Sequence, residues 1–175
     1  MLKKSVEKAF NDQLNAETYS AYLYWSMSAW CEKNNLPGFA NWMRVQAREE
    51  MTHAVKFYTY LIDRGATVKL TAIAAPETDW KDIEAIFAAT LKHEQYVTAL
   101  INNLADLAIK EKDHAVGQFL QWFVNEQVEE EKNAEQILGQ LKMMGKQTGA
   151  TLYLLDKEMA TRVFVPPAQA QGEAQ

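Results

Sequence analysis

The sequence of 175 residues contains a single cysteine, Cys31, and therefore no Cys-x-x-Cys pair. One cysteine cannot form an internal disulfide, so we expect Cys31 to be a buried apolar residue in a protein of the reducing cytoplasm. No apolar run approaches the ~18 residues of a membrane-spanning helix, and the first residues, MLKKSVEKAFNDQ, turn polar too early for a signal peptide. These absences argue against a disulfide scaffold, a thiolate zinc site and a membrane protein.

Glycine, proline and positive charge are also scarce. The chain has seven glycines, four prolines and a formal net charge of -5, with 48% hydrophobic and 23% charged residues. This composition is typical of a globular protein. The mild acidity, without a basic stripe, argues against nucleic acid as a partner. We expect one domain over residues 1–165 and a loose tail at 166–175.

Apolar residues recur at steps of three and four over four long segments, which predicts an all-α protein. The predicted helices cover residues 3 to about 34, 39 to about 65, 80 to about 110 and, after a short turn KEKDHA, about 116 to 145, with Asp79 or Thr78 capping the third. Residues 65–79 lack this period and contain Pro76, and they are long enough to connect opposite ends of a bundle. A short fifth helix, TLYLLDKEMA, is expected at 151–160. The predicted fold is a four-helix bundle with one long crossover.

Each long helix carries polar residues in the middle of its apolar stripe. In chain order these are Glu17, then Glu50 and His53, then Glu94, then Gln127 and Glu130. Counted from the turns near residues 36 and 112, they fall at about the same height in two antiparallel hairpins. An offset of 77 residues separates Glu17 from Glu94, Glu50 from Gln127, His53 from Glu130 and Glu49 from Glu126. This offset predicts two hairpins related by an approximate twofold axis through one site.

Four buried carboxylates in one layer would repel one another strongly. At about 5 Å spacing they make six pairs of roughly 3 kcal/mol each, on the order of 20 kcal/mol in total at an effective dielectric near 20. That exceeds the ~5–15 kcal/mol by which a domain is stable, so protons or cations must neutralise the group. Two divalent ions would balance the four charges, and a neutral histidine would add a nitrogen ligand. Such ligands favour ions such as Fe²⁺, Mn²⁺ or Zn²⁺.

Four segments resemble the bacterial non-haem ferritins: LNAETYSAYLYWSM, GFANWMRVQAREEMTH, KHEQYVT and FLQWFVNEQVEEEK. The resemblance extends over nearly all of residues 1–165. It implies a ferroxidase that oxidises Fe²⁺ with O₂ or H₂O₂ and stores ferric oxyhydroxide inside a shell of 24 identical subunits. The ligand arrangement that it implies is the general one for ferritin-like di-metal bundles, in which glutamates and histidines project inward from all four helices.

The resemblance also implies roles for individual residues. Glu17, Glu50 and His53 would hold one iron, Glu94 and Glu130 the second, with Glu50 bridging and Gln127 adjacent. Glu49, Glu126 and Glu129 match a third iron site of the family, and Tyr24 matches a redox-active neighbour of the site. Gln127-Val-Glu-Glu130 stands where bacterioferritins look like Glu-x-x-His. That departure favours a non-haem ferritin, so we expect Met51 to be a packing residue and no haem to bind.

The residues alone leave other interpretations open. Tyr24 is equally explained as a core tyrosine bonded to a carboxylate, and NEQVEEEK as a solvated helix face. His93 and His114 lack a ligand partner at helical spacing, so we expect both at the surface. A di-metal oxidase without storage, or a structural bundle with protonated carboxylates, also fits. The absence of Cys-x-x-Cys pairs argues against a rubrerythrin-like peroxide reductase.

Overall fold

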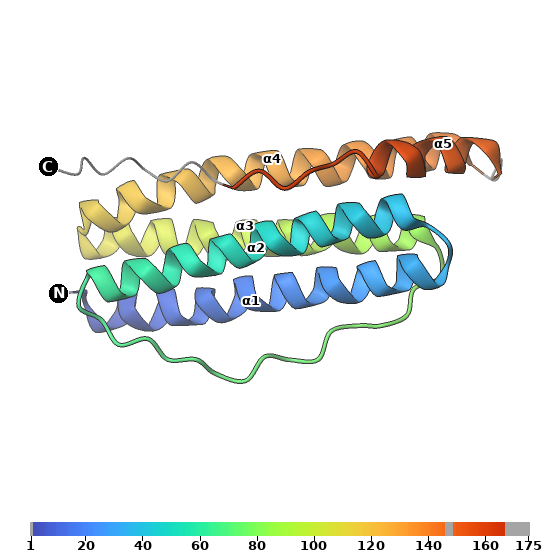
Figure 1. Cartoon of the computed structure of the whole chain (residues 1–175). Helices are drawn as coiled ribbons and strands as arrows, with labels where there is room; N and C mark the ends of the chain where they lie inside the picture. Colours follow the sequence, from blue (N-terminus) through green and yellow to red (C-terminus); the bar gives the residue numbers. More distant parts are fainter. Residues whose placement is uncertain (1, 146–148, 167–175) are drawn as a thin grey trace, which may run out of the picture.

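The computed structural model describes residues 2–145 and 149–166 and consists of helices (Figure 1). These are α1 (Lys4–Lys33), α2 (Pro37–Asp63), α3 (Ile83–Glu111), α4 (His114–Met144) and α5 (Ala150–Met159). α1 packs against α2 and α3 against α4, while α1 also contacts α3. The predicted all-α architecture, with four long helices, a long crossover and a short fifth helix, is confirmed.

No helix within the described ranges combines the length and the apolar character that crossing a membrane requires. The predicted tail at 166–175 lies outside the described residues, apart from Pro166. Gly145 was expected to end the fourth helix, and it directly follows α4 with a positive φ of 56°. Residues 146–148 lie outside the described part.

The crossover between α2 and α3 runs along the length of the bundle beside α1 (Figure 1). Side chains of α1 fix it at several points. Asn11 Nδ2 donates to the carbonyl of Thr67 at 3.0 Å, and Asn15 Nδ2 donates to Thr71 Oγ1 at 2.8 Å. Ser26 Oγ donates to the carbonyl of Glu77 at 2.6 Å. The crossover therefore returns the chain to the end where α2 began, and α2 and α3 run in the same direction.

The start of the third helix differs from the prediction. α3 begins at Ile83, and its N-cap is Asp82 instead of Asp79 or Thr78. The Asp82 carboxylate accepts a hydrogen bond from the Ala85 amide at 2.8 Å, which satisfies a free donor of the first turn. Trp80 precedes α3, so it lies at the end of the crossover, where it is buried against the apolar core.

The buried apolar side chains form two clusters at opposite ends of the bundle. The first cluster, near the α1–α2 turn, includes Met27, Phe39 and Phe87. The second cluster, near the α3–α4 turn, includes Phe10 and Phe57, whose ring centroids lie 5.1 Å apart. Between them, the side chains that point inward from the four long helices are polar. The fold thus holds a polar layer at mid-height between two apolar regions.

α5 docks on the amino-terminal end of α2 through Asp156 and Gly38. Asp156 Oδ1 accepts hydrogen bonds from the amides of Gly38 at 2.8 Å and Phe39 at 3.0 Å, which are orphan donors of the first helical turn. The Asp156 backbone comes so close that a Cβ at Gly38 would lie 1.6 Å from its carbonyl oxygen. Only glycine allows this contact, so Gly38 sets the position of α5.

We expect Gly38→Ala to separate α5 from α2 and to destabilise the protein by about 2 kcal/mol, as overpacking does elsewhere. Thermal unfolding followed by circular dichroism measures the change. Gly139→Ala in α4 is the matched control, because a Cβ there meets nothing within 4 Å. It should raise stability by about 0.5–1 kcal/mol, the helix preference of alanine over glycine. Equal unfolding temperatures for both variants would contradict the close-contact argument.

Candidate metal centre

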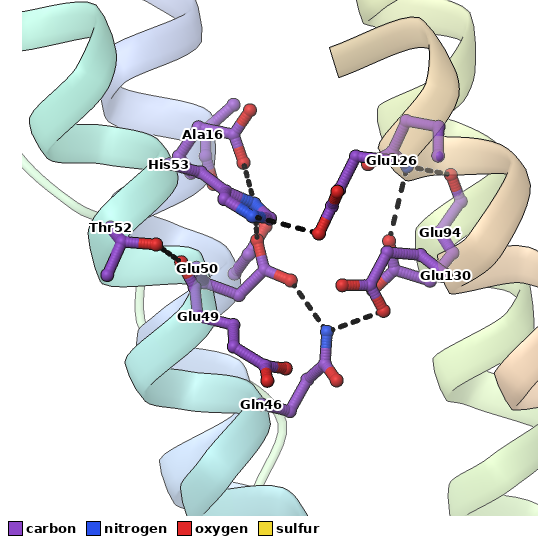
Figure 2. A network of polar contacts seen from close by, with 12 residues as sticks. Ala16, Gln46, Glu49, Glu50, Thr52, His53, Glu94, Glu126 and Glu130 are labelled. Atoms are coloured by element: carbon purple, nitrogen blue, oxygen red, sulfur yellow. Dashed lines mark hydrogen bonds and ion pairs between the residues drawn. The ribbon is translucent and has the colours of Figure 1, made fainter. Parts of the chain in front are cut away.

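The polar layer brings together the residues that the sequence singles out, with contributions from all four long helices. Glu17 comes from α1, Glu50 and His53 from α2, Glu94 from α3, and Gln127 and Glu130 from α4. Each of these six residues is at most 5% exposed. Figure 2 shows the carboxylates of α2 and α4 facing one another across the layer. The structure therefore places all six predicted di-metal ligands in one buried region.

His53 lies at the centre of this group. Its Nδ1 is 3.4 Å from Glu50 Oε2 and 3.9 Å from Glu17 Oε2, and its Nε2 is 3.9 Å from Glu126 Oε1. Two sets of three ligand atoms lie within 4.8 Å of one another: Glu17, Glu50 and His53, and His53, Glu126 and Glu130. The spacing of Glu50 and His53, one turn apart on α2, is what directs both side chains to the same point.

Two glutamines that the sequence analysis did not select also belong to the site. Gln46 Nε2 donates to Glu50 Oε1 at 3.0 Å and to Glu130 Oε2 at 2.8 Å, so one amide links α2 to α4 (Figure 2). Gln13 Nε2 donates to Glu17 Oε1 at 2.8 Å. Each glutamine lies four residues before its glutamate. A buried-face glutamine one turn before a candidate ligand was the signal that could have found them.

Glu94 is held by two neighbours. The Tyr24 hydroxyl donates a hydrogen bond to Glu94 Oε1, and Gln127 Nε2 donates to Glu94 Oε2 at 3.3 Å. Burial, followed by the charge of Glu94, raises the pKa of Tyr24 well above its usual value, so the phenol stays protonated and keeps donating. Tyr24 is thus both a buried core tyrosine and a direct partner of a candidate ligand.

His93, which was expected at the surface, is half-buried. Its Nε2 lies 2.8 Å from Ser20 Oγ, and its ring packs on the ring of Tyr24 with centroids 6.0 Å apart. The small side chain of Ser20 on α1 leaves room for the imidazole between α1 and α3. His114, in contrast, is exposed as predicted.

Burial and mutual repulsion change the protonation of the site. Burial, followed by the charge of Glu50, raises the pKa values of Glu17 and Glu130 to about 8, and the same causes raise that of Glu94. Burial opposes the ionic form of Glu50 as well, but the hydrogen bond and charge of His53 overcome it and lower the pKa of Glu50. Without a metal, the site therefore holds ionised Glu50 among protonated neighbours.

His53 carries the matching positive charge. Burial alone would lower the pKa of His53, but the hydrogen bond to Glu50 and the charges of Glu50 and Glu17 raise it to about 10. Without a metal, bound protons thus neutralise most of the four carboxylates and remove the repulsion that the sequence predicts. A divalent cation would have to displace these protons, since metal ligands bind in their deprotonated forms.

The three residues of the predicted third site lie beside this layer but are not gathered at one point. Glu126 approaches His53, and Glu129 is exposed. Glu49 Oε2 pairs instead with Arg162 Nη2 at 2.5 Å. Burial raises the pKa of Glu49 and of Glu126, while Arg162 lowers that of Glu49 and His53 lowers that of Glu126. Among the residues that the structure describes, no three-ligand group includes Glu49 or Glu129.

The donor set fits a pair of hard or borderline divalent ions. Glu17 Oε2 is buried and has no hydrogen-bond partner among the described residues. A buried polar atom without a partner is costly, and a bound metal ion would satisfy it. Carboxylate oxygens with one imidazole suit iron, manganese or zinc. Fold and site together define a four-helix bundle whose buried carboxylate and imidazole groups could hold metal ions.

Comparisons with known proteins agree with this class. The sequence pattern of the family described as Ferritin-like domain matches residues 7–144. Proteins named bacterial non-heme ferritin from Staphylococcus aureus strain MRSA252 and from Staphylococcus saprophyticus are 43% and 45% identical over 164 residues, which is 94% of this chain and 98% of each relative. The chain therefore belongs to the ferritin-like family.

Solved structures give the same result. An open-pore ferritin from the archaeon Archaeoglobus fulgidus superposes with a TM-score of 0.91 at 43% identity, covering 93% of this chain and 98% of that one. A form of the ferritin from the same organism, engineered to be closed, superposes with a TM-score of 0.92 at 44% identity, covering 94% and 100%. The likeness thus extends over nearly the whole chain.

Proposed function

We propose that the protein is an iron-storage ferroxidase that binds two Fe²⁺ ions at the polar layer, oxidises them and deposits ferric oxyhydroxide inside a shell of its own subunits. The observation that carries this proposal is the buried set of four glutamates and one histidine, contributed by four helices and exposed by at most 5%. O₂ or H₂O₂ would accept the electrons of the two Fe²⁺ ions, which are substrates. Hydrolysis of the ferric product would release protons.

The chain's own residues have distinct parts in this proposal. Glu17, Glu50 and His53 would bind one Fe²⁺, and Glu94 and Glu130 the other, with Glu50 between them. Gln46 supports this arrangement, because it holds Glu50 and Glu130 on opposite sides of the site by two hydrogen bonds. Gln127 orients Glu94 in the same way. Carboxylates stabilise Fe³⁺ more than Fe²⁺, so these ligands favour oxidation.

Two further assignments belong to the proposal. Tyr24, hydrogen-bonded to Glu94, would be the redox-active neighbour of the iron pair. Glu49, Glu126 and Glu129 would bind a third ion on its way from the pair to the mineral. The support for this third site is that burial, together with the charges of neighbouring glutamates, raises the pKa values of Glu49 and Glu126, a penalty that a bound cation would relieve.

A homo-oligomer is part of the proposal. The outer faces of α1 and α2 carry large exposed hydrophobic side chains at helical spacing: Tyr22, Trp25, Met51, Val55, Tyr58 and Ile62. Such a stripe is typical of a subunit contact. In this arrangement Met51 packs between subunits and binds no haem. Assembly of 24 subunits of 20.0 kDa would give about 480 kDa, with α5 at the fourfold contacts.

We also propose a cytoplasmic location. Cys31 is buried and free, as expected, and burial raises the pKa of its thiol to about 12, so it is poorly nucleophilic. A thiol of this kind suits a reducing compartment but has no part in the iron chemistry.

Adding Fe²⁺ in air to the metal-free protein tests the proposed function. The absorbance of the ferric product measures oxidation, and the native mass together with the iron content per particle measures storage. We expect rapid oxidation and a load far above two or three ions per chain in a particle of many subunits. Protein preloaded with Zn²⁺ is the control, because zinc takes the same ligands and has no redox chemistry. It should oxidise Fe²⁺ slowly.

The two competing interpretations give different results in this experiment. A di-metal oxidase without storage would oxidise Fe²⁺ quickly but retain about two ions per chain in a small oligomer. A structural bundle with protonated carboxylates would bind no iron, and zinc preloading would change nothing. Either outcome would contradict the storage function.

A further inference from the structure

Arg162 lies in the segment after α5 and reaches back to the middle of α2. Its Nη2 is 2.5 Å from Glu49 Oε2, and each of these two side chains is 21% exposed. The guanidinium carbon also lies 4.2 Å from the centre of the Trp42 ring, and Nη1 donates to the Trp42 carbonyl at 3.4 Å. Three contacts on one face of α2 fix the guanidinium much more firmly than an exposed ion pair does.

The backbone around Arg162 is fixed independently of Glu49. Asn41 Nδ2 donates to the Arg162 carbonyl at 2.9 Å and to the Ala160 carbonyl at 3.3 Å. Two residues further on, the Phe164 ring lies 4.3 Å from the guanidinium carbon of Arg48. Together with the docking of α5 at Gly38, these contacts place the Arg162 side chain next to Glu49. The ion pair is therefore a consequence of how the end of the chain packs on α2.

The pairing with Arg162 has a direct effect on the carboxylate. A guanidinium bound to Oε2 occupies one of the two carboxylate oxygens and holds the side chain toward Arg162, so the guanidinium and a cation compete for Glu49. It also changes the charge of the set formed by Glu49, Glu126 and Glu129, from three negative charges to a net of two. Both effects weaken the attraction of this set for a divalent ion.

We propose that Arg162 is a positioning residue that holds Glu49 in the metal-free protein and competes with the third Fe²⁺ ion for this carboxylate. The inference rests on the proposed function, because it assigns a regulator to the third site of that proposal. The third ion would bind only when the Arg162–Glu49 pair opens. Passage of iron out of the di-metal site would then depend on the segment that follows α5.

Zn²⁺ binding to the assembled protein, measured by equilibrium dialysis, tests the inference without any redox reaction. The parent should bind two ions tightly and a third weakly. Arg162→Ala should raise the affinity for the third Zn²⁺ ion by about five- to tenfold, the effect expected when a partly buried competing ion pair is lost. The affinities for the first two Zn²⁺ ions should stay unchanged. Arg162→Lys keeps the charge and should stay closer to the parent.

A double-mutant comparison separates competition from a loosened chain end. In a Glu49→Gln background the third Zn²⁺ ion should bind weakly, and Arg162→Ala should no longer change its affinity. The matched control is Arg44→Ala, which breaks another ion pair of α2, between Arg44 Nη1 and Glu32 Oε1 at 2.6 Å. It should leave the affinities for all three Zn²⁺ ions as in the parent.

Two results would overturn the inference alone. The first is an unchanged affinity for the third Zn²⁺ ion in Arg162→Ala. The second is an equal gain in that affinity with and without the Glu49 carboxylate. In both cases the first two ions still bind. Failure of the parent to bind the first two ions would overturn the proposed function together with this inference. The two kinds of failure are therefore distinguished in one titration.

Discussion

Glu50→Ala should lower the initial rate of Fe²⁺ oxidation by about 100-fold or more, because even indirect partners of a metal ligand change metal affinity or activity by 10–100-fold. Glu50 lies beside His53 and accepts a hydrogen bond from Gln46, so it is the carboxylate best placed to serve both ions. Ferric absorbance after rapid mixing gives the rate. Zn²⁺ binding to the same variant should fall below two ions per chain.

The control for this variant must preserve the fold. Glu50→Gln keeps the volume of the side chain and removes the charge, so it should lose oxidation as Glu50→Ala does while keeping the helical circular dichroism. Glu32→Ala removes an exposed carboxylate that pairs with Arg44. It should oxidise Fe²⁺ at the parent rate. Equal initial rates in the parent and both Glu50 variants would remove Glu50 from the proposed reaction.

The metal-free protein should become less stable as the pH rises from about 5 to about 8. Glu17 and Glu130, whose pKa values are about 8, keep their protons in the folded state, whereas the unfolded chain has released them above its usual pKa of 4.5. The folded state then binds more protons than the unfolded state, and stability falls with rising pH. One such shift corresponds to on the order of 5 kcal/mol.

Zn²⁺ should reverse this trend, because it replaces the protons. At pH 7 its binding should release up to four protons per chain, one each from Glu17, Glu94, Glu130 and His53. Thermal unfolding between pH 5 and pH 8, with and without Zn²⁺, measures the stability, and a weakly buffered titration measures the protons. A melting temperature of the metal-free protein that rises over this range would contradict the proposed protonation.

Much of the fold and of the central site could be predicted from the sequence because both depend on helical spacing. The positions of Glu17, Glu50 and His53 in apolar stripes place them on inward faces, and the structure describes them there. The cap of α3 was missed because Asp79 and Asp82 are both suitable N-cap residues. The structure decides between them, because the Asp82 carboxylate accepts a hydrogen bond from the Ala85 amide.

The parts that could not be predicted depend on contacts between distant segments. No local pattern indicates that Arg162 meets Glu49, because that contact requires α5 to dock at Gly38. Similarly, the half-burial of His93 depends on its contact with Ser20, which lies on another helix. Helical periodicity identifies which face of a helix is buried, but it does not identify which side chain of another element covers it.

The division of the apolar core into two clusters limits how ions can reach the polar layer. Rings such as Phe10, Phe57 and Phe123 fill the bundle on one side of the layer, and Met27 and Phe87 fill it on the other. A hydrated cation would have to lose its water to pass through either apolar cluster, and this desolvation costs too much free energy. If the layer binds iron as proposed, the ions would therefore have to enter laterally, between neighbouring helices, and would not travel along the bundle axis.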